Sequence, residues 1–483
     1  MAVNETAASR ATPSRRRIGV PDIVFFVVAA SSPLTVAAGG TPQNFATTGV
    51  LGVPAMFLIL AVVLVVFSAG YAAMSRHISN AGAFYAYITH GIGRIPGVGA
   101  SFVALVAYNA MQVGLYGLLG FSTSGFLSSA FGVDLPWWVV SLAFLAVIAF
   151  LGYRRVDLNA KVLAVLLVCE SLLVLVFDVS QIATAPQGLS LEPFSWSALT
   201  TGAVGAGFLW TMAAFMGFES GAIYSEECRD PRRTVSRATY ISVAVIGVFY
   251  AFTAWATAVG AGVDNVIAAS REHGPDLVFV LGERTLGSGF STLGQVFLIT
   301  AVFAATLAFH NAVARYFFAL GREGVLPARL GGLHPRHASP YMGSISQTVF
   351  AVVVVLGFGV LGGDPMGTLF NWFTNLGALG VIMLLVATSV AVIGFFGRDA
   401  RGESAWSRVI APALSGVALL VVLYVAFTNF SALLGTPPDS MLNWVLPAVM
   451  VLVGVVGIGY GAYLRSADPQ AYARIGQGAP AQD

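Results

Sequence analysis

The chain has 483 residues, of which 57% are hydrophobic and only 10% are charged, and its mean hydropathy is +0.82. A soluble domain is typically about a quarter charged, so 24 basic and 22 acidic residues are too few to cover a soluble protein of this size. This composition excludes a soluble enzyme, a nucleic-acid-binding protein and a disordered scaffold. Two cysteines do not make a disulfide framework. The sequence therefore predicts an all-α polytopic membrane protein.

Apolar runs that reach the roughly 20 residues of a spanning helix recur about twelve times. The predicted spans are 20–48, 50–75, 97–130, 136–153, 158–179, 198–226, 236–262, 290–321, 342–361, 366–396, 408–433 and 441–465. The polar, basic stretch before them is not a signal peptide, because the first run is too long and further runs follow it. We interpret that stretch as an uncleaved cytoplasmic tail.

The placement of basic residues predicts the orientation of the spans. With the N-terminus inside, every lysine and arginine falls in a cytoplasmic segment or at the cytoplasmic end of a span, except Arg271 and Arg284, which lie in one long external loop, 263–289. Cytoplasmic loops of membrane proteins carry an excess of such residues. We therefore expect a multi-pass protein of the cell membrane with both termini in the cytoplasm. The length of the external loop suggests an outer lid.

Two predicted spans carry signs of a broken helix at membrane depth. The first span contains Ser31-Ser32-Pro33, and the sixth contains Gly217-Phe218-Glu219-Ser220-Gly221. Proline removes a backbone donor, and paired glycines around a charged residue weaken a helix. Spans one and six are corresponding positions in two inverted halves of five helices, and such matched breaks mark the substrate site of secondary transporters. We expect a LeuT-like 5+5 inverted repeat with helices 1 and 6 broken, and with non-helical backbone near 32–37 and 217–221.

The predicted organisation follows from this repeat. Helices 1–5 form the first repeat, helices 6–10 form the second, and helices 11 and 12 are additional. The corresponding boundaries are 1–18 for the N-terminal tail, 19–180 and 195–397 for the two repeats, 405–465 for the last two helices and 466–483 for the C-terminal tail.

Four stretches of sequence resemble the amino acid–polyamine–organocation (APC) superfamily of permeases. They are TPQNFATTG after span one, NAGAFYAYITHGIG after span two, AFMGFES with EECRDPRRTVSRA at span six, and NAVARYFFALGREGVLP at the end of span eight. Their order and spacing match the bacterial amino acid permeases of that superfamily. One departure is that Thr35-Val36-Ala37 replace the Gly-Ser-Gly found in many members at the first break, which indicates a tighter pocket.

The breaks and the resemblance together predict the substrate site. Helix ends freed by a break bind charged groups: N-termini attract a carboxylate, and free carbonyls accept from an ammonium. We expect a zwitterionic amino acid with its carboxylate at the N–H groups near Thr35–Ala37 and Gly221, and its ammonium at carbonyls near Ser32 and Phe218. The resemblance places Glu219 toward the substrate. The predicted substrate-binding residues are Ser32, Thr35, Val36, Ala37, Asn109, Gln112, Gly217, Phe218, Glu219, Ser220 and Gly221.

Lys161 is the only lysine in the chain and begins the fifth span. All other basic residues of the chain are arginines. Lysine differs from arginine because burial can lower its pKa enough for it to release a proton. The resemblance adds that proton-coupled members carry a lysine early in this span. We therefore predict that Lys161 couples transport to protons. Glu170 also lies at membrane depth, but it is nine residues from Lys161, on the opposite helix face at about 100° per residue, and no role is predicted for it.

The segment that follows span six contains opposite charges at the cytoplasmic interface. Glu226 and Glu227 precede Arg232 and Arg233, and ion pairs among them are candidates for gating residues. A solvated loop obeying the positive-inside rule explains the arginines equally well.

The predicted function is import of a small amino acid by proton symport with alternating access. The partners are then the substrate (an amino acid or a polyamine), protons and the lipid bilayer; we expect no nucleic acid, cofactor or metal, and no obligate protein partner is evident. One alternative is a polyamine or cationic amino acid exchanger in which Glu219 binds the cation. A channel is the other rival class, but it requires a pore-lining ring or filter. The sequence contains neither a P-loop nor zinc-ligand spacing, so an ATP-driven pump and an enzyme are not expected.

Overall fold

The computed structural model describes residues 19–478 except 79–81, 83, 155–159, 220–230, 338 and 438. Every regular element in these ranges is a helix. The first half contains α1 (Val20–Ser31), η1 (Thr35–Gly40), α2 (Thr41–Thr48), α3 (Val53–Ser75), α4 (Phe84–Gly91), α5 (Arg94–Phe131), α6 (Trp137–Arg154), α7 (Ala160–Ala183), η2 (Glu192–Phe194), α8 (Trp196–Thr200) and α9 (Val204–Phe215).

The second half continues in the same way. Its elements are α11 (Pro231–Ala261), α12 (Val266–His273), η4 (Gly274–Asp276), α13 (Leu277–Leu286), α14 (Ser288–Glu323), η5 (Ala328–Gly331), α15 (Tyr341–Val360), η6 (Pro365–Phe370), α16 (Asn371–Arg398), η7 (Trp406–Ile410), α17 (Ala411–Thr428), α18 (Phe430–Leu434), α19 (Leu442–Ala467) and α20 (Pro469–Arg474).

Eleven helices of the described chain are long and apolar enough to cross a membrane. This confirms the predicted all-α polytopic class. The predicted sixth span is represented by α9, whose 12 residues are too few to cross alone, and residues 220–230 lie outside the described ranges. The count of twelve, the inverted repeat and the domain boundaries remain predictions.

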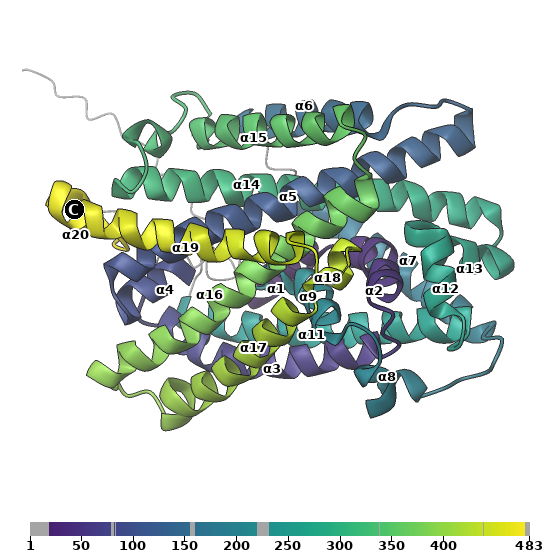
Figure 1. Cartoon of the computed structure of the whole chain (residues 1–483), viewed down its shortest axis with the longest axis horizontal. Helices are drawn as coiled ribbons and strands as arrows, with labels where there is room; N and C mark the ends of the chain where they lie inside the picture. Colours follow the sequence, from purple (N-terminus) through teal and green to yellow (C-terminus); the bar gives the residue numbers. More distant parts are fainter. Residues whose placement is uncertain are drawn as a thin grey trace, which may run out of the picture.

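The long helices run roughly side by side along one axis (Figure 1). The short elements α4 and α20 lie at one end, and α8, α12 and α13 lie at the opposite end. Glycines allow the central α5 to approach its neighbours closely: a Cβ on Gly377 of α16 would lie 2.8 Å from the Ala107 carbonyl, and one on Gly457 of α19 would lie 2.8 Å from the Gly99 Cα. Small residues serve this purpose in membrane helices.

Burial separates the inner helices from the outer ones. The apolar window of α5 is 83% buried, whereas that of α19 is only 22% buried. The exposed side chains of α19 include the apolar Leu452, Val455 and Val456. The burial therefore places α5 at the core of the bundle and α19 at its periphery. The exposed apolar face of α19 suits contact with lipid rather than water.

The first predicted break is present but narrower than expected. The chain leaves the helical conformation at Ser32, which has φ 49° and ψ 84°, in the left-handed region. The prediction of non-helical backbone over 32–37 is too broad, since Thr35–Gly40 already forms a wide helical turn that continues into α2. Pro33 explains the early restart, because proline has the φ of a first helical residue and lacks only an N–H that would be unpaired there.

The second predicted break follows α9. The helix ends at Phe215, and Met216–Glu219 form a turn in which Gly217 has a φ of 103°. This positive φ requires glycine or strain. Residues Ser220 and Gly221 of the same motif lie outside the described ranges.

The C-terminal segment folds back onto the end of the bundle marked by α4. After α20, the Glu323 carboxylate at the end of α14 accepts hydrogen bonds from the N–H groups of Gly476 at 2.9 Å and Gly478 at 3.2 Å. The ring of His90 in α4 lies 3.0 Å from the Gly476 carbonyl oxygen. Ile475 is only 2% exposed, so the segment is packed into the surface.

Candidate functional site

A cavity lies where the breaks of α1 and α9 face α5, α14 and η6. Its polar walls are the side chains of Ser31, Ser32, Thr35, Thr41, Asn44 and Thr374. The remaining lining is apolar or glycine: Ala30, Val36, Gly40, Phe57, Met111, Leu115, Trp210, Ala213, Ala214, Met216, Ala305, Phe309 and Phe370. Within the described chain, the wall of this cavity contains no charged side chain. It suits a small, mostly apolar solute with few polar groups.

The first break supplies the hydroxyl groups of the cavity. The Ser32 Oγ lies 2.7 Å from the Thr35 Oγ1, and the Ser31 Oγ lies 2.8 Å from the phenol oxygen of Tyr250 on α11. The carboxylate of Glu170 accepts a hydrogen bond of 2.6 Å from the Leu34 N–H. The backbone donor freed by the break is therefore paired with an acid from α7, as buried donors usually are paired.

The second break is built around Glu219, which is 1% exposed. One carboxylate oxygen accepts a hydrogen bond from the Tyr108 hydroxyl of α5, and the other accepts from the Gly217 N–H at 3.1 Å. The Tyr71 hydroxyl of α3 donates to the Glu219 carbonyl at 3.2 Å. These bonds hold the turn to α3 and α5, and Glu219 is not among the residues that line the cavity.

Two aromatic rings close the cavity next to α2. The rings of Trp210 and Phe370 lie 5.3 Å apart between centroids, and the Trp210 Nε1 donates to the Thr47 Oγ1 at 3.0 Å. The loop 263–289, which the sequence predicts to be an outer lid, contains α12, η4 and α13, and the Arg271 Nε donates to the Ala46 carbonyl at 3.0 Å. The loop 263–289 is therefore attached to the helix that follows the first break.

Of the residues predicted from sequence, Ser32, Thr35 and Val36 line the cavity. Ala37, Phe218 and Glu219 are buried beside it without contributing to its wall. Gly217 is buried at the second break and does not line the cavity either. Asn109 donates to the Leu105 carbonyl of its own helix at 2.6 Å.

Gln112 belongs to a separate polar network. Its amide contacts the Gln347 side chain of α15, and its Nε2 lies 3.2 Å from the His310 Nδ1 of α14. His310 in turn contacts the Ser344 Oγ at 2.8 Å. This network joins three helices behind the cavity, which is the usual role of polar side chains in membrane bundles.

The remaining candidates lie at the limits of the described chain. Lys161 is in the first turn of α7, but its side chain is outside the described residues. Glu226, Glu227 and the side chain of Arg232 are also outside them, and Arg233 lies exposed near the start of α11.

Sequence reasoning missed the aromatic and apolar walls. Phe57, Trp210, Phe309 and Phe370 lie on four separate elements, and each resembles any other apolar residue of a spanning helix. Among the apolar lining residues, only Met111 could be suspected from the sequence, because it is adjacent to the predicted Gln112. Glu170 had the signal of an acid at membrane depth, but its partner is distant in sequence.

Helices interrupted next to a small cavity, inside a bundle of apolar helices, are typical of secondary transporters. The sequence matches the model of the family described as amino acid permease over residues 18–456. The chain belongs to this family, a member of the APC superfamily.

Relatives of this chain include proteins with named substrates. It is 23% identical to the branched-chain amino acid permease BcaP of Bacillus subtilis, over 78% of this chain and 81% of the relative. It is 22% identical to the low-affinity putrescine importer PlaP of Escherichia coli, over 74% of this chain and 78% of the relative. It is 24% identical to the human cystine/glutamate transporter, over 67% of this chain and 63% of the relative.

Proposed function

We propose that this protein imports a small apolar α-amino acid by proton symport with alternating access. The observation that carries the proposal is the cavity at the two breaks, whose wall, among the residues that the structure describes, combines hydroxyl groups with apolar side chains and no charge. An amino acid with an aliphatic side chain needs both kinds of surface. The similarity to a branched-chain amino acid permease supports the same substrate class.

The substrate pose follows from the chemistry of the first break. The carboxylate lies at the start of η1, near Thr35–Ala37, where the hydroxyls of Ser32 and Thr35 and the helix dipole favour a negative charge. The ammonium lies near the carbonyls of Ser32 and Phe218. The aliphatic side chain packs against Phe57, Trp210 and Phe309.

Coupling and orientation complete the proposal. Both termini lie in the cytoplasm of a cell-membrane protein, and the end marked by α4 and α20 faces inward. Lys161 participates in proton coupling, because lysine exchanges a proton where arginine does not. Glu226 and Glu227 form gating ion pairs with Arg232 and Arg233 during the inward opening.

A polyamine or cationic amino acid exchanger is the second candidate, supported by the similarity to a putrescine importer. That function calls for an acid that meets the substrate cation. The geometry argues against it, because Glu219 is already bonded to Tyr108 and to the Gly217 N–H and does not line the cavity.

Ligand-induced thermal stabilisation of the purified protein separates these candidates, because a ligand that binds only the folded state raises the unfolding temperature. We expect leucine, isoleucine and valine to stabilise the protein, and leucine methyl ester, putrescine and arginine to have no effect at equal concentration. Stabilisation by putrescine or arginine, but not by the aliphatic amino acids, would contradict the proposed substrate class.

A further inference from the structure

Glu170 connects α7 to the first break. It lies near the middle of α7 and is 7% exposed. Its Oε1 accepts from the Leu34 N–H at 2.6 Å and lies 3.4 Å from the Ser32 Oγ. Both contacts fall on the two residues that flank Pro33, so this one carboxylate oxygen holds the chain on each side of the break.

The Ser32 hydroxyl has three candidate acceptors: the Thr35 Oγ1 at 2.7 Å, the Glu170 Oε1 at 3.4 Å and the Ala301 carbonyl oxygen of α14 at 3.3 Å. When the Thr35 hydroxyl donates to Ser32, the Ser32 hydrogen has a choice between Glu170 and Ala301. A hydroxyl has one hydrogen and donates it to one acceptor at a time. An ionised Glu170 is the stronger acceptor, because hydrogen bonds to a charged group are roughly twice as strong as neutral ones. A protonated Glu170 donates to Ser32 instead, and the Ser32 hydrogen then turns to Ala301.

The same hydroxyl is part of the substrate cavity. Ser32 and Thr35 line the cavity, and their side-chain oxygens are 2.7 Å apart. A substrate that forms a hydrogen bond with either hydroxyl therefore changes the hydrogen bond between Ser32 and Glu170. Substrate binding and protonation act on one shared hydrogen bond, which is the physical requirement for coupling between two sites.

The surroundings of Glu170 hold no countercharge in the described chain. From α11, the Tyr250 phenol contacts Ser31; from α14, the Ala301 carbonyl contacts the Ser32 hydroxyl; and α1 contributes the Ser32 hydroxyl and the Leu34 N–H. The next acid along α7, Asp178, is bonded to Thr253 at 2.8 Å. An acid at membrane depth without a countercharge is a candidate functional residue by default.

We propose that Glu170 binds the transported proton and couples it to the movement of α1, an inference that rests on the proposed proton symport. Its role is separate from that of Lys161 at the start of the same helix. A proton arriving at the carboxylate forms the O–H bond, moves the Ser32 hydrogen to α14 and weakens the bond from Leu34. Loss of that proton to the opposite side restores the original bonds. The Leu34 N–H directed at the same oxygen disfavours a metal cation there.

The test uses proteoliposomes containing the full chain, with leucine as the probe and the membrane potential clamped. An inward gradient of about one pH unit sustains about tenfold accumulation at one proton per substrate. Glu170→Gln keeps an oxygen for the Leu34 N–H but does not titrate. We expect this variant to bring leucine only to about equal concentrations inside and outside the vesicles. Leucine exchange across the membrane without a pH gradient should persist. Asp178→Asn is the matched control, because it neutralises another buried acid of α7, and it should accumulate leucine as the unmodified protein does.

Substrate-linked proton uptake provides a second readout that needs no transport. When leucine is added in weakly buffered detergent solution, the unmodified protein should take up protons in the pH range in which transport is coupled. The Glu170→Gln variant should take up none. If Glu170→Gln proves too unstable to purify, Glu170→Asp is the variant to measure. It keeps a titrating carboxyl and should still take up protons.

The outcomes distinguish the two proposals. Failure of the unmodified protein to accumulate leucine under a pH gradient would contradict proton symport itself. Normal accumulation and proton uptake by Glu170→Gln would overturn only the role of Glu170. Accumulation that requires sodium rather than a pH gradient would overturn both.

Discussion

Ser32 is the residue at which the break, the cavity and the intramembrane acid meet. Its left-handed backbone conformation is uncommon for a residue with a side chain, and strain of this kind costs about 1 kcal/mol. Glycine would relieve that strain, so the presence of serine points to a use for the hydroxyl. The bonds to Thr35 and Glu170 supply that use.

We predict that Ser32→Gly weakens leucine binding about fivefold without lowering the thermal stability of the protein. The substitution removes a hydroxyl of the cavity wall, worth about 1 kcal/mol, while glycine adopts the same backbone conformation at no steric cost. Titration of leucine against the purified variant measures the affinity. Unchanged affinity would show that the hydroxyl does not contact the substrate.

Lys161→Arg tests the predicted coupling lysine at the start of α7. Arginine preserves the positive charge and therefore the topology, but it does not release a proton. We expect the variant to insert and to bind leucine, yet to lose accumulation driven by a pH gradient. Normal accumulation would show that Lys161 contributes only a positive charge that orients the helix in the membrane.

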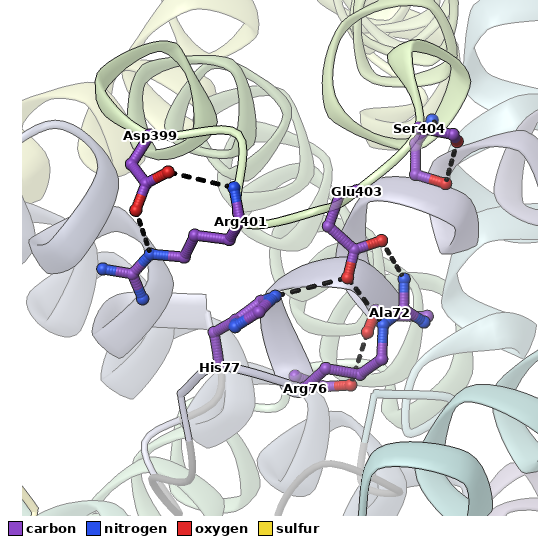
Figure 2. Close-up of polar contacts among 9 residues, drawn as sticks. Ala72, Arg76, His77, Asp399, Arg401, Glu403 and Ser404 are labelled. Atoms are coloured by element: carbon purple, nitrogen blue, oxygen red, sulfur yellow. Dashed lines mark hydrogen bonds and ion pairs between the residues drawn. The ribbon is translucent and has the colours of Figure 1, made fainter.

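The end of α3 is tied to the loop between α16 and α17 by an ion pair. Figure 2 shows the Glu403 carboxylate between Arg76 and His77, with Asp399 and Arg401 paired beside it. The Arg76 Nε and Nη2 donate to the two oxygens of Glu403 at 2.8 and 2.5 Å. Burial alone would raise the pKa of Glu403, but the hydrogen bond and positive charge of Arg76, together with His77, outweigh it and hold that pKa below its usual range.

The lowered pKa of Glu403 predicts a pH-dependent contribution to stability. A carboxyl with a depressed folded-state pKa stabilises the fold above its unfolded pKa of about 4.3, and that contribution is lost as the pH falls through the folded value. We expect Glu403→Gln to lower the unfolding temperature at pH 7 by about 1–2 °C, as for a pair worth about 1 kcal/mol. The difference from the unmodified protein should shrink below pH 4. An equal difference at both pH values would contradict the ion-pair explanation.

The docking of the C-terminal segment depends on Gly476. This residue has a φ of 79°, and a Cβ there would lie 2.6 Å from the Thr89 Cγ2 of α4. We predict that Gly476→Ala displaces the segment from Glu323 and lowers the unfolding temperature. Gly459→Ala on α19 is the matched control, because a Cβ there meets nothing within 4 Å. If both variants melt at the same temperature, the segment does not contribute to stability.

At the scale of the whole molecule, the sequence predicted the helical class, both breaks and the candidate acids. These features are local: Ser31-Ser32-Pro33 and Gly217-Phe218-Glu219 each carry their signal within a few residues. What it did not predict depends on side chains that meet only in three dimensions. The bond between Glu170 and Leu34 joins residues 136 positions apart, and Gln112 meets Gln347 across 235 positions. The break was narrower than expected because Pro33 also starts the next helix.

Accumulation of labelled leucine in proteoliposomes, with the membrane potential clamped and the pH lower outside than inside, tests the central claim most directly. We predict uptake above equilibrium that a protonophore collapses and that excess valine, but not putrescine, prevents. Uptake that never exceeds equilibrium with a pH gradient in place, or that proceeds equally when the gradient is removed, would contradict proton-coupled import of an apolar amino acid.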